Sequence, residues 1–245
     1  MEPLVPTLDP VLDLTRSGAR HGWGVFETLH LARGRALRLP LHLERLAAGT
    51  AFLGLPPPPA QAEIEALLAR LPRPDEGILR LQAVDRSLIL SAAPLEDAPA
   101  LPATLDLADS LVRLSSSPLN RFKTLAYLEN RLLAREAEAR GLTEVVALNE
   151  RGEVTDGSRT TLLLVRGGAL LTPPAAAGAL PGVARRVILE AGLAREAVLL
   201  PGDLEAADAL FLASSLRGIL PVATYRGRAR TVPGDLLAAL RALLD

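Results

Sequence analysis

The 245-residue sequence contains no cysteine, which excludes disulfide bonds, thiolate metal ligands and cysteine nucleophiles. No uncharged apolar run approaches the roughly 18 residues that a membrane-spanning helix needs. The N-terminal residues MEPLVPTLDP lack the basic and then apolar pattern of a signal peptide. We therefore expect a cytoplasmic protein that does not associate with a membrane.

Several function classes are disfavoured by other absences. The net charge is −1 and the pI about 6.3, so the basic excess typical of nucleic-acid-binding proteins is missing. The three histidines, His21, His30 and His42, lack metal-ligand spacing, and no HExxH motif occurs. Neither a G-x-S-x-G nucleophile motif nor a complete dinucleotide or phosphate-binding glycine motif is present. We expect no metal site and no nucleic-acid partner.

Lysine is nearly absent. The chain has 27 Lys and Arg residues, and Lys123 is the only lysine among them. Arginine forms better bidentate ion pairs and stays charged, whereas lysine can lose its proton, attack a carbonyl carbon and form an imine. A single lysine in an arginine-rich chain therefore indicates amine chemistry, although a surface lysine that escaped the compositional bias is an equally good interpretation of composition alone.

The order of elements predicts a mixed α/β fold. A hairpin over 24–39 is expected to turn at Arg33-Gly34, and a helix over 39–55 to bury Leu39, Leu43, Leu46 and Phe52. A second long helix is predicted over 124–140, with Leu125, Leu128, Leu132 and Ala139 toward the core. The other predicted helices cover 61–71, 183–192 and 233–244, and the other predicted strands cover 77–84, 86–93, 104–107, 110–115, 144–149, 160–165, 169–172, 209–215 and 218–225.

Two lobes fit this order best. We predict a smaller N-terminal α/β lobe over 1–113, a connection over 114–120 and a larger C-terminal α/β lobe over 121–245 that carries Lys123. The stretch 93–103 is polar and rich in proline, and no internal repeat or low-complexity linker is visible.

A lysine that carries pyridoxal 5'-phosphate (PLP) needs partners for the phosphate and for the pyridine nitrogen. An arginine and the N-terminus of a helix suit the phosphate. Arg45 lies on a predicted helix, and Leu180-Pro181-Gly182 precedes a helix whose first amides belong to Val183 and Ala184. Taken singly, these are as readily a solvated arginine and an ordinary loop-to-helix junction.

Two more segments offer suitable groups. Asp156, in VTDGSRT, is a carboxylate that could keep a pyridine nitrogen protonated, so that the ring acts as an electron sink. Ser214 and Ser215 end an apolar strand and carry hydroxyls that could bind a phosphate. An Asp-Gly turn and polar strand-end residues explain the same patterns without a cofactor.

In their order along the chain, these segments resemble the class IV aminotransferase family of fold-type IV PLP enzymes, and most closely its aminodeoxychorismate lyase branch. The resemblance covers residues from about 21 to 225. It rests on GVFETL (24–29), HLERL (42–46), FKTLAYLEN (122–130), VTDGSRT (154–160), TPP with LPGVAR (172–185) and SSLRGILPV (214–222).

The resemblance implies a two-lobed fold like that of D-amino acid aminotransferase, a homodimer, and PLP bound covalently to Lys123. It implies that the phosphate is held by Arg45, by the Val183 and Ala184 amides and by Ser215 together with Ser214. It also implies that Asp156 faces the pyridine nitrogen.

The chain departs from the family pattern at four places. Asp156 stands where glutamate is usual, and Ala126 where many relatives have asparagine. Ala184 stands where threonine is common, and Trp23, in His21-Gly22-Trp23-Gly24, replaces an acid near the expected substrate entrance. Trp23, His30 and Arg80 are our candidates for substrate contacts.

The function implied by the resemblance is a lyase of folate biosynthesis that converts 4-amino-4-deoxychorismate to 4-aminobenzoate and pyruvate. A branched-chain or D-amino acid aminotransferase on the same scaffold is the alternative. A non-catalytic relative that binds PLP or a small anion is a third interpretation, against which the retained Lys123 argues.

Overall fold

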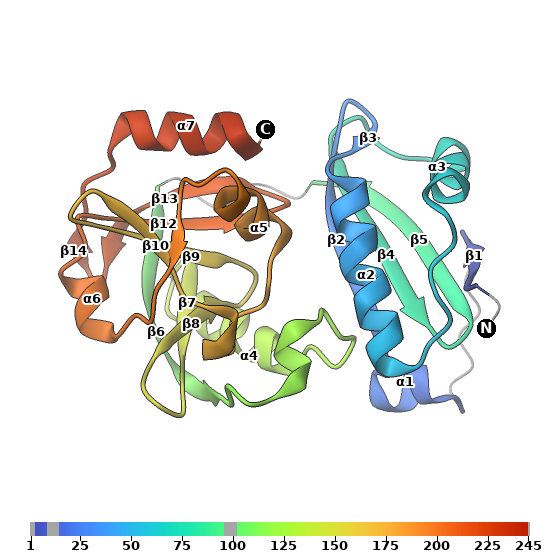
Figure 1. The fold of residues 1–245 in the computed structure, drawn as a ribbon, viewed down its shortest axis with the longest axis horizontal. Coiled ribbons are helices and arrows are strands. Elements are labelled where there is room, and N and C mark those ends of the chain that lie inside the picture. Colours follow the sequence, from blue (N-terminus) through green and yellow to red (C-terminus); the bar gives the residue numbers. More distant parts are fainter. Residues whose placement is uncertain (1–2, 9–14, 96–101, 245) are drawn as a thin grey trace. The chain divides into compact units, whose positions relative to one another are not determined.

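The computed structural model describes residues 3–8, 15–95 and 102–244, and these form two compact units of mixed α/β structure (Figure 1). Unit 1 comprises Met1–Asp97 and Phe122–Tyr127, and unit 2 comprises Ala98–Arg121 and Leu128–Asp245. This division differs from the predicted lobes because Ala103–Arg113 pairs with strands of unit 2, whereas the Lys123 segment pairs with a strand of unit 1. In the proline-rich stretch 93–103, residues 96–101 lie outside the described residues.

Unit 1 is built on a five-stranded sheet in the order β1-β5-β4-β2-β3 (Figure 1). The strands are β1 (Val5–Thr7), β2 (Gly24–Ala32), β3 (Arg35–Ala36), β4 (Gly77–Val84) and β5 (Ser87–Pro94). The predicted hairpin is confirmed, because β2 and β3 are antiparallel and turn at Arg33 and Gly34. Both turn residues have positive φ, 51° and 69°, as a two-residue turn of this kind requires.

The helices of unit 1 are α1 (Ser17–His21), α2 (Leu39–Leu53) and α3 (Gln61–Arg70). Helix α2 packs on β2 and buries Leu39, Leu43 and Leu46, as predicted. The prediction for Phe52 is wrong, since its side chain is 46% exposed and stacks on Phe122 with ring centroids 4.7 Å apart. The helix therefore presents a narrower apolar face to the sheet than its sequence suggests.

Unit 2 contains a nine-stranded sheet whose main path is β11-β10-β9-β12-β13-β6-β7-β8, with β14 paired to β13. Parallel pairs, such as β6 with β7 and with β13, are mixed with antiparallel ones, such as β9 with β12. The strands are β6 (Ala103–Arg113), β7 (Glu144–Asn149), β8 (Val154–Gly157), β9 (Thr161–Arg166), β10 (Ala169–Thr172), β11 (Arg195–Glu196), β12 (Ala209–Ser214), β13 (Gly218–Tyr225) and β14 (Arg228–Ala229).

Helices α5 (Val183–Glu190) and α7 (Gly234–Leu244) cover one side of this sheet. Their apolar residues, among them Ile188 and Leu240, form a cluster with Phe211 of β12. The predicted helices over 183–192 and 233–244 are thereby confirmed. The helical elements of unit 2 are η1 (Pro118–Arg121), α4 (Leu128–Ala139), η2 (Ala175–Ala177), α5 (Val183–Glu190), α6 (Pro201–Glu205) and α7 (Gly234–Leu244).

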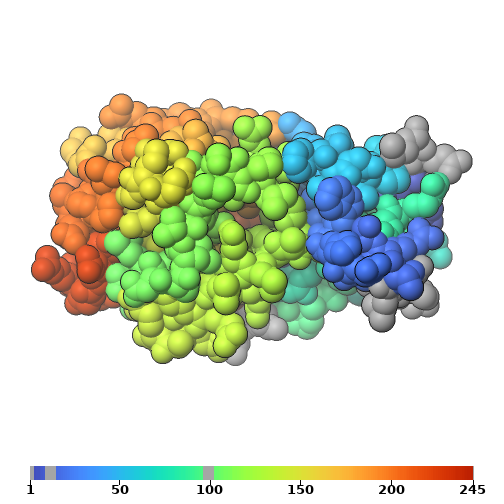
Figure 2. Space-filling view, turned by 90° about the horizontal axis from the view of Figure 1, so that it is seen from below, coloured from blue at the N-terminus to red at the C-terminus, as the bar shows by residue number. Residues whose placement is uncertain are grey.

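Helix α4 begins four residues later than predicted and turns a different face inward. Leu133 and Ala137 are buried, whereas Leu128 is 77% exposed and Leu132 is 47% exposed. The yellow-green surface of this helix is visible in Figure 2. Alanine and leucine occur around the whole helix, so the sequence pattern fits more than one inward face.

Strand β6 joins the two predicted strands, 104–107 and 110–115, into one strand that ends at Arg113. Its pairing with β7 is irregular between Leu107 and Val112. The amides of Asp109 and Ser110 at this irregularity donate hydrogen bonds to the Glu136 carboxylate of α4, at 2.8 and 2.9 Å. Glu136 therefore satisfies backbone donors that the strand pairing leaves out.

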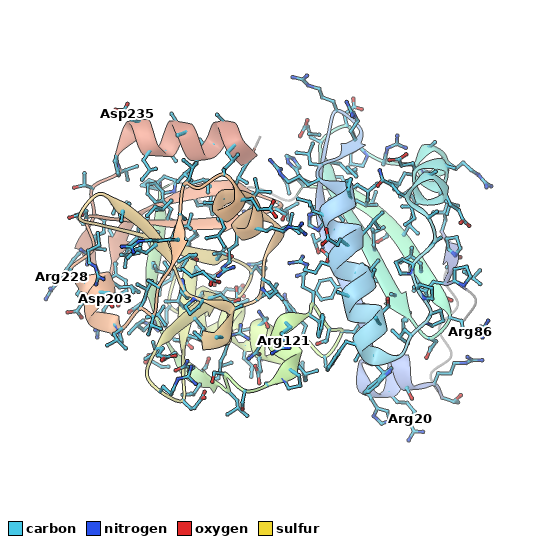
Figure 3. All side chains as sticks on the ribbon, viewed as in Figure 1. Arg20, Arg86, Arg121, Asp203, Arg228 and Asp235 are labelled. Carbon is cyan, nitrogen blue, oxygen red and sulfur yellow. The ribbon has the colours of Figure 1, made fainter. Side chains whose placement is uncertain are left out.

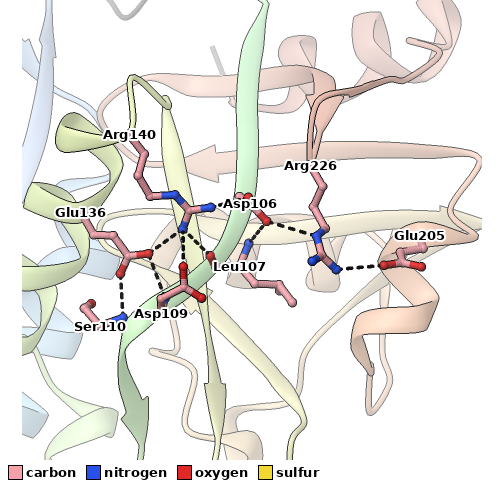
Figure 4. Close-up of polar contacts among 8 residues, drawn as sticks. All are labelled: Asp106, Leu107, Asp109, Ser110, Glu136, Arg140, Glu205 and Arg226. Atoms are coloured by element: carbon pink, nitrogen blue, oxygen red, sulfur yellow. Dashed lines mark hydrogen bonds and ion pairs between the residues drawn. The ribbon is translucent and has the colours of Figure 1, made fainter.

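Arg140 joins the same carboxylate to two strand residues (Figure 4). Its guanidinium contacts Glu136 at 2.7 Å and Asp109 at 3.3 Å, and it also pairs with Asp106. Asp106 lies 3.6 Å from Arg226, which in turn pairs with Glu205 of α6. The network thus links α4, β6, α6 and the turn after β13.

We expect Arg140→Met to lower the free energy of unfolding by about 1–2 kcal/mol, because one guanidinium serves three acids and a carbonyl of β6. Urea unfolding measures this change. The matched control is Arg186→Met, whose ion pair with Glu190 lies on an exposed helix surface and is worth about 0.3–0.5 kcal/mol. Equal losses in the two variants would refute a network contribution.

In the described part of the chain, none of the helices is long and apolar enough to cross a membrane. Charged side chains such as Arg20, Arg86 and Arg228 extend away from the ribbon (Figure 3). Within the same residues, no group of three or more His, Asp or Glu side chains could hold a metal ion.

Candidate active site

The Lys123 segment lies alongside the first residues of β2 and is not helical, contrary to the prediction of a helix from residue 124. The Phe26 amide donates to the Lys123 carbonyl at 2.7 Å, and the Leu125 amide donates to the Gly24 carbonyl at 2.8 Å. An antiparallel bridge joins Val25 to Thr124. Because these contacts fix the backbone from Lys123 to Leu125, β2 sets the point from which the Lys123 side chain extends.

Two glycines permit this close pairing. A Cβ atom on Gly24 would lie 2.6 Å from both the Leu125 side chain and the Ala83 carbonyl oxygen. A Cβ atom on Gly22, which has a φ of 64°, would lie 2.8 Å from the Ala126 amide nitrogen. These distances are too short for any side chain, so the Gly22-Trp23-Gly24 run is what allows the lysine segment to approach β2.

The Lys123 amine lies between two aromatic rings. Its Nζ is 4.2 Å from the ring centroid of Phe26 and 4.7 Å from that of Tyr127, and it donates to the Tyr127 hydroxyl at 3.4 Å. The rings meet edge to face, with centroids 5.1 Å apart. Five of the seven aromatic residues of the chain occur within 23–52 and 122–127, and this clustering is a sequence signal for the site.

Arg45 is held by a buried acid. Its Nε donates to Glu27 Oε1 at 2.7 Å and its Nη2 to Glu27 Oε2 at 2.6 Å, and His42 Nδ1 lies 2.6 Å from the same Oε2. Glu27 and His42 are each 1% exposed. Both were missed as site residues by the sequence analysis.

Burial and charged neighbours set the protonation states of Glu27 and His42. Burial alone would raise the pKa of Glu27, but the charge and hydrogen bonds of Arg45, helped by His42, lower it to about 2. Burial lowers the pKa of His42, and the positive charges of Arg45 and Lys123 lower it further. The hydrogen bond and charge of Glu27 oppose this change but do not reverse it. At neutral pH, therefore, Glu27 is ionised and His42 is an uncharged donor.

Asp156 lies near the end of β8 and is 6% exposed. Its Oδ2 accepts a hydrogen bond from the Leu180 amide at 2.9 Å, and its Oδ1 lies 3.1 Å from Nε of Arg113. The Arg113 side chain is only 5% exposed. A buried cation beside a carboxylate favours the ionised acid, so Asp156 is suited to hold a protonated ring nitrogen.

A second buried acid organises the turn that follows Asp156. Glu144 accepts hydrogen bonds from the Ser158 amide and the Thr160 hydroxyl, both at 3.0 Å, and from the Arg159 amide at 3.3 Å. Burial raises the pKa of Glu144, and these hydrogen bonds oppose the rise. The Glu144 carboxylate, at the start of β7, thus holds the VTDGSRT turn in place.

The predicted phosphate ligands of unit 2 lie at two chain turns. Helix α5 starts at Val183 after Gly182, so the amides of Val183 and Ala184 are in its first turn, where no intrahelical acceptor exists. Ser214 ends β12, and its hydroxyl accepts from the Arg217 amide at 3.1 Å, while Ser215 lies in the turn that leads to β13. An amide pair and a hydroxyl-bearing turn are both suitable for an oxyanion.

The three candidate substrate residues belong to unit 1. Trp23 is 47% exposed and donates through its indole nitrogen to the Leu53 carbonyl at 3.1 Å. His30 lies on β2, four residues after Phe26. Its Nε2 is 3.2 Å from Oε2 of Glu76. Arg80 is exposed on β4 directly opposite Thr28, on the same sheet face as Phe26 and His30.

The predicted site residues therefore fall into two sets. Lys123 and Arg45 belong to unit 1, and Asp156, Val183, Ala184, Ser214 and Ser215 belong to unit 2. An amine, a paired arginine, a helix N-terminus and a buried carboxylate are the groups that a phosphorylated pyridine aldehyde requires. The chemistry of the residues present fits PLP.

Known proteins are similar to this chain in sequence and in fold. A sequence model of the family described as amino-transferase class IV matches residues 24–225. A bifunctional aminodeoxychorismate lyase and D-amino acid transaminase of Mycobacterium tuberculosis is 28% identical, over 94% of this chain and 92% of its own.

Two solved structures are similar over nearly their whole length. One, provisionally assigned as a 4-amino-4-deoxychorismate lyase, is 32% identical, with a TM-score of 0.79 over 98% of this chain and 96% of its own. The other, the fold IV-transaminase CpuTA1 of Curtobacterium pusillum, is 28% identical, with a TM-score of 0.80 over 96% of this chain and 88% of its own.

Proposed function

Because the chain belongs to the class IV aminotransferase family, whose members are PLP-dependent enzymes, we propose that it is the lyase that converts 4-amino-4-deoxychorismate to 4-aminobenzoate and pyruvate. The fold-type IV class predicted from the sequence is confirmed by its likeness to a fold IV-transaminase. The observation that carries the proposal is the placement of the only lysine, whose amine lies over the Phe26 and Tyr127 rings. Support for the lyase comes from two relatives that carry this name, one of them also a transaminase.

The cofactor is pyridoxal 5'-phosphate, and each set of residues has a role toward it. When bound, PLP supplies an aldehyde for amines and an electron sink for a developing carbanion. Lys123 would bind it covalently, and Arg45, the Val183 and Ala184 amides, Ser214 and Ser215 would hold its phosphate. Asp156 would accept a hydrogen bond from the protonated pyridine nitrogen. Arg113, beside it, favours the ionised carboxylate.

The reaction needs one group that moves a proton at the substrate carbon bearing nitrogen. Lys123, released and neutral, would remove this proton and return one as the ether bond to pyruvate breaks. The Tyr127 hydroxyl lies 3.4 Å from the amine and would help to orient it toward the substrate carbon. Formation of the aromatic ring of 4-aminobenzoate drives the reaction forward.

Substrate recognition is assigned to unit 1. Arg80 projects from the face of the sheet that also carries Phe26 and His30, so a substrate carboxylate would meet a cation there. Trp23, exposed beside the lysine segment, would contact the substrate through its indole. A homodimer, a cytoplasmic location and a place in folate biosynthesis belong to the same proposal.

A transaminase is the second candidate, and the relatives favour it as well, because CpuTA1 and one activity of the Mycobacterium tuberculosis protein are transaminases. Purified protein supplied with PLP and 4-amino-4-deoxychorismate separates the two. The lyase predicts equal amounts of 4-aminobenzoate and pyruvate without any amino acceptor. A keto acid formed only when an amino acceptor is added, with branched-chain or D-amino acids as donors, would replace the lyase by a transaminase.

A further inference from the structure

Strand β2 carries an acid at a position where its neighbours are apolar. Val25, Leu29 and Leu31 point from β2 into the core of unit 1, and Glu27 shares their side of the strand with 1% of its surface exposed. Burying a carboxylate is unfavourable unless it is paired and hydrogen-bonded. Its partners, Arg45 and His42, lie three residues apart on α2, so both reach it from one helix face.

The contacts use one edge of the Arg45 guanidinium. Glu27 accepts hydrogen bonds along the edge formed by Nε and Nη2, from Nε to Oε1 at 2.7 Å and from Nη2 to Oε2 at 2.6 Å. This fixes the plane of the guanidinium and directs its other edge, made by Nη1 and the second Nη2 hydrogen, away from the carboxylate. His42 holds Glu27 in turn, through an Nδ1 contact of 2.6 Å to Oε2.

We propose that Glu27 is a positioning residue for phosphate binding, which orients Arg45 so that its outer edge receives the phosphate of PLP, while His42 keeps Glu27 in place. The inference rests on the proposed role of Arg45 as a phosphate ligand. A carboxylate behind the arginine weakens the overall attraction for an anion. Glu27 therefore favours phosphate binding through geometry. A guanidinium that is already fixed loses less side-chain entropy when it forms two parallel hydrogen bonds to the phosphate.

Glu27→Asp separates geometry from charge, because aspartate keeps the negative charge but is too short to make both contacts. Apoprotein is titrated with PLP and with pyridoxal, which lacks the phosphate, and each Kd is read from absorbance. We expect the Kd for PLP to rise about tenfold, the size seen when the partner that orients a ligand-binding group is lost, and the Kd for pyridoxal to stay unchanged. Glu44→Asp, an exposed acid of the same helix, is the matched control and should change neither value.

The coupling to Arg45 is tested in an Arg45→Lys background, where a point charge replaces the planar fork and Glu27→Asp should change the PLP Kd less than twofold. His42 gives a second route if Glu27→Asp folds poorly. His42→Asn keeps a donor near the Nδ1 position and should preserve the preference for PLP over pyridoxal, whereas His42→Ala should reduce it.

Equal weakening of PLP and pyridoxal, or an undiminished effect of Glu27→Asp in the Arg45→Lys background, would overturn the positioning role. Because these measurements use binding alone, they are independent of whether the enzyme is a lyase or a transaminase. If Arg45→Lys and Arg45→Ala leave the PLP Kd unchanged, the proposed phosphate site itself is wrong.

Discussion

Replacing Lys123 by arginine is expected to reduce turnover by at least about 1,000-fold, because no other side chain of the protein can form the covalent bond to the cofactor. Arginine keeps the positive charge but does not lose its proton at any working pH, so it can neither bond to the aldehyde nor act as a base. Product formation under saturating PLP measures the loss. Binding of PLP without the covalent absorbance band is the accompanying result.

The control is Arg121→Lys, which adds a lysine at an exposed position two residues away and should leave turnover within about twofold, as for a surface change away from the chemistry. A Lys123→Arg protein with full turnover would show that the Lys123 amine takes no part in the reaction. If the unsubstituted protein shows no absorbance change when PLP is added, the chain is instead a non-catalytic relative of the family.

Replacing Asp156 by asparagine is expected to lower kcat by about 100- to 1,000-fold, the size of effect seen when one preorganised electrostatic partner is removed. The amide cannot keep a ring nitrogen protonated, and Arg113, with a side chain 5% exposed, loses the negative charge at 3.1 Å from its Nε. The KM for the substrate should change little, because Asp156 is not assigned to substrate contacts. Steady-state kinetics at saturating PLP separate the two parameters.

Asp156→Glu is the matched variant, since it keeps the charge and restores the acid that is usual in the family. We expect it to retain activity within about tenfold of the parent, a loss small beside that of removing the carboxylate. Thermal unfolding of both variants checks the fold, because Asp156→Asn leaves the buried Arg113 with the more distant Glu129, 3.7 Å from its Nη1, as its carboxylate partner. The loss of one partner from a buried ion pair destabilises a protein by up to about 3–5 kcal/mol. If Asp156→Asn is as active as Asp156→Glu, a negative charge at this position has no part in the reaction.

Local sequence signals predicted most of the elements. The Arg33-Gly34 turn has the positive φ values that its hairpin needs, and α5 starts directly after Leu180-Pro181-Gly182. The strand over 209–214 and its antiparallel partner over 218–225 were also predicted. These features depend on neighbouring residues, so short-range propensity was sufficient to find them.

The segment that carries the lysine could not be predicted in this way. Leu125 and Leu128 fit a helical pattern, yet the backbone of residues 123–125 pairs with residues 24–26 of β2, far earlier in the chain. Helical periodicity does not register a long-range backbone pairing of this kind. The same pairing places Phe122–Tyr127 in unit 1, which a boundary drawn from composition does not capture.

The charged partners of the site were missed for a related reason. Glu27, His42 and Arg113 resemble solvated residues in a sequence with 22% charged residues, and only their burial distinguishes them. A usable signal existed for Glu27, since it interrupts an alternating apolar series on a strand. Arg113 carried no such signal, because the buried acid that it pairs with lies 43 residues later in the chain.

The covalent attachment of PLP to Lys123 is tested most directly by borohydride reduction of the PLP-loaded protein, followed by mass mapping of its peptides. The account predicts a single pyridoxyl group, on the peptide that contains Lys123. A label on the α-amino group of the chain, or no stable label at all, would contradict it.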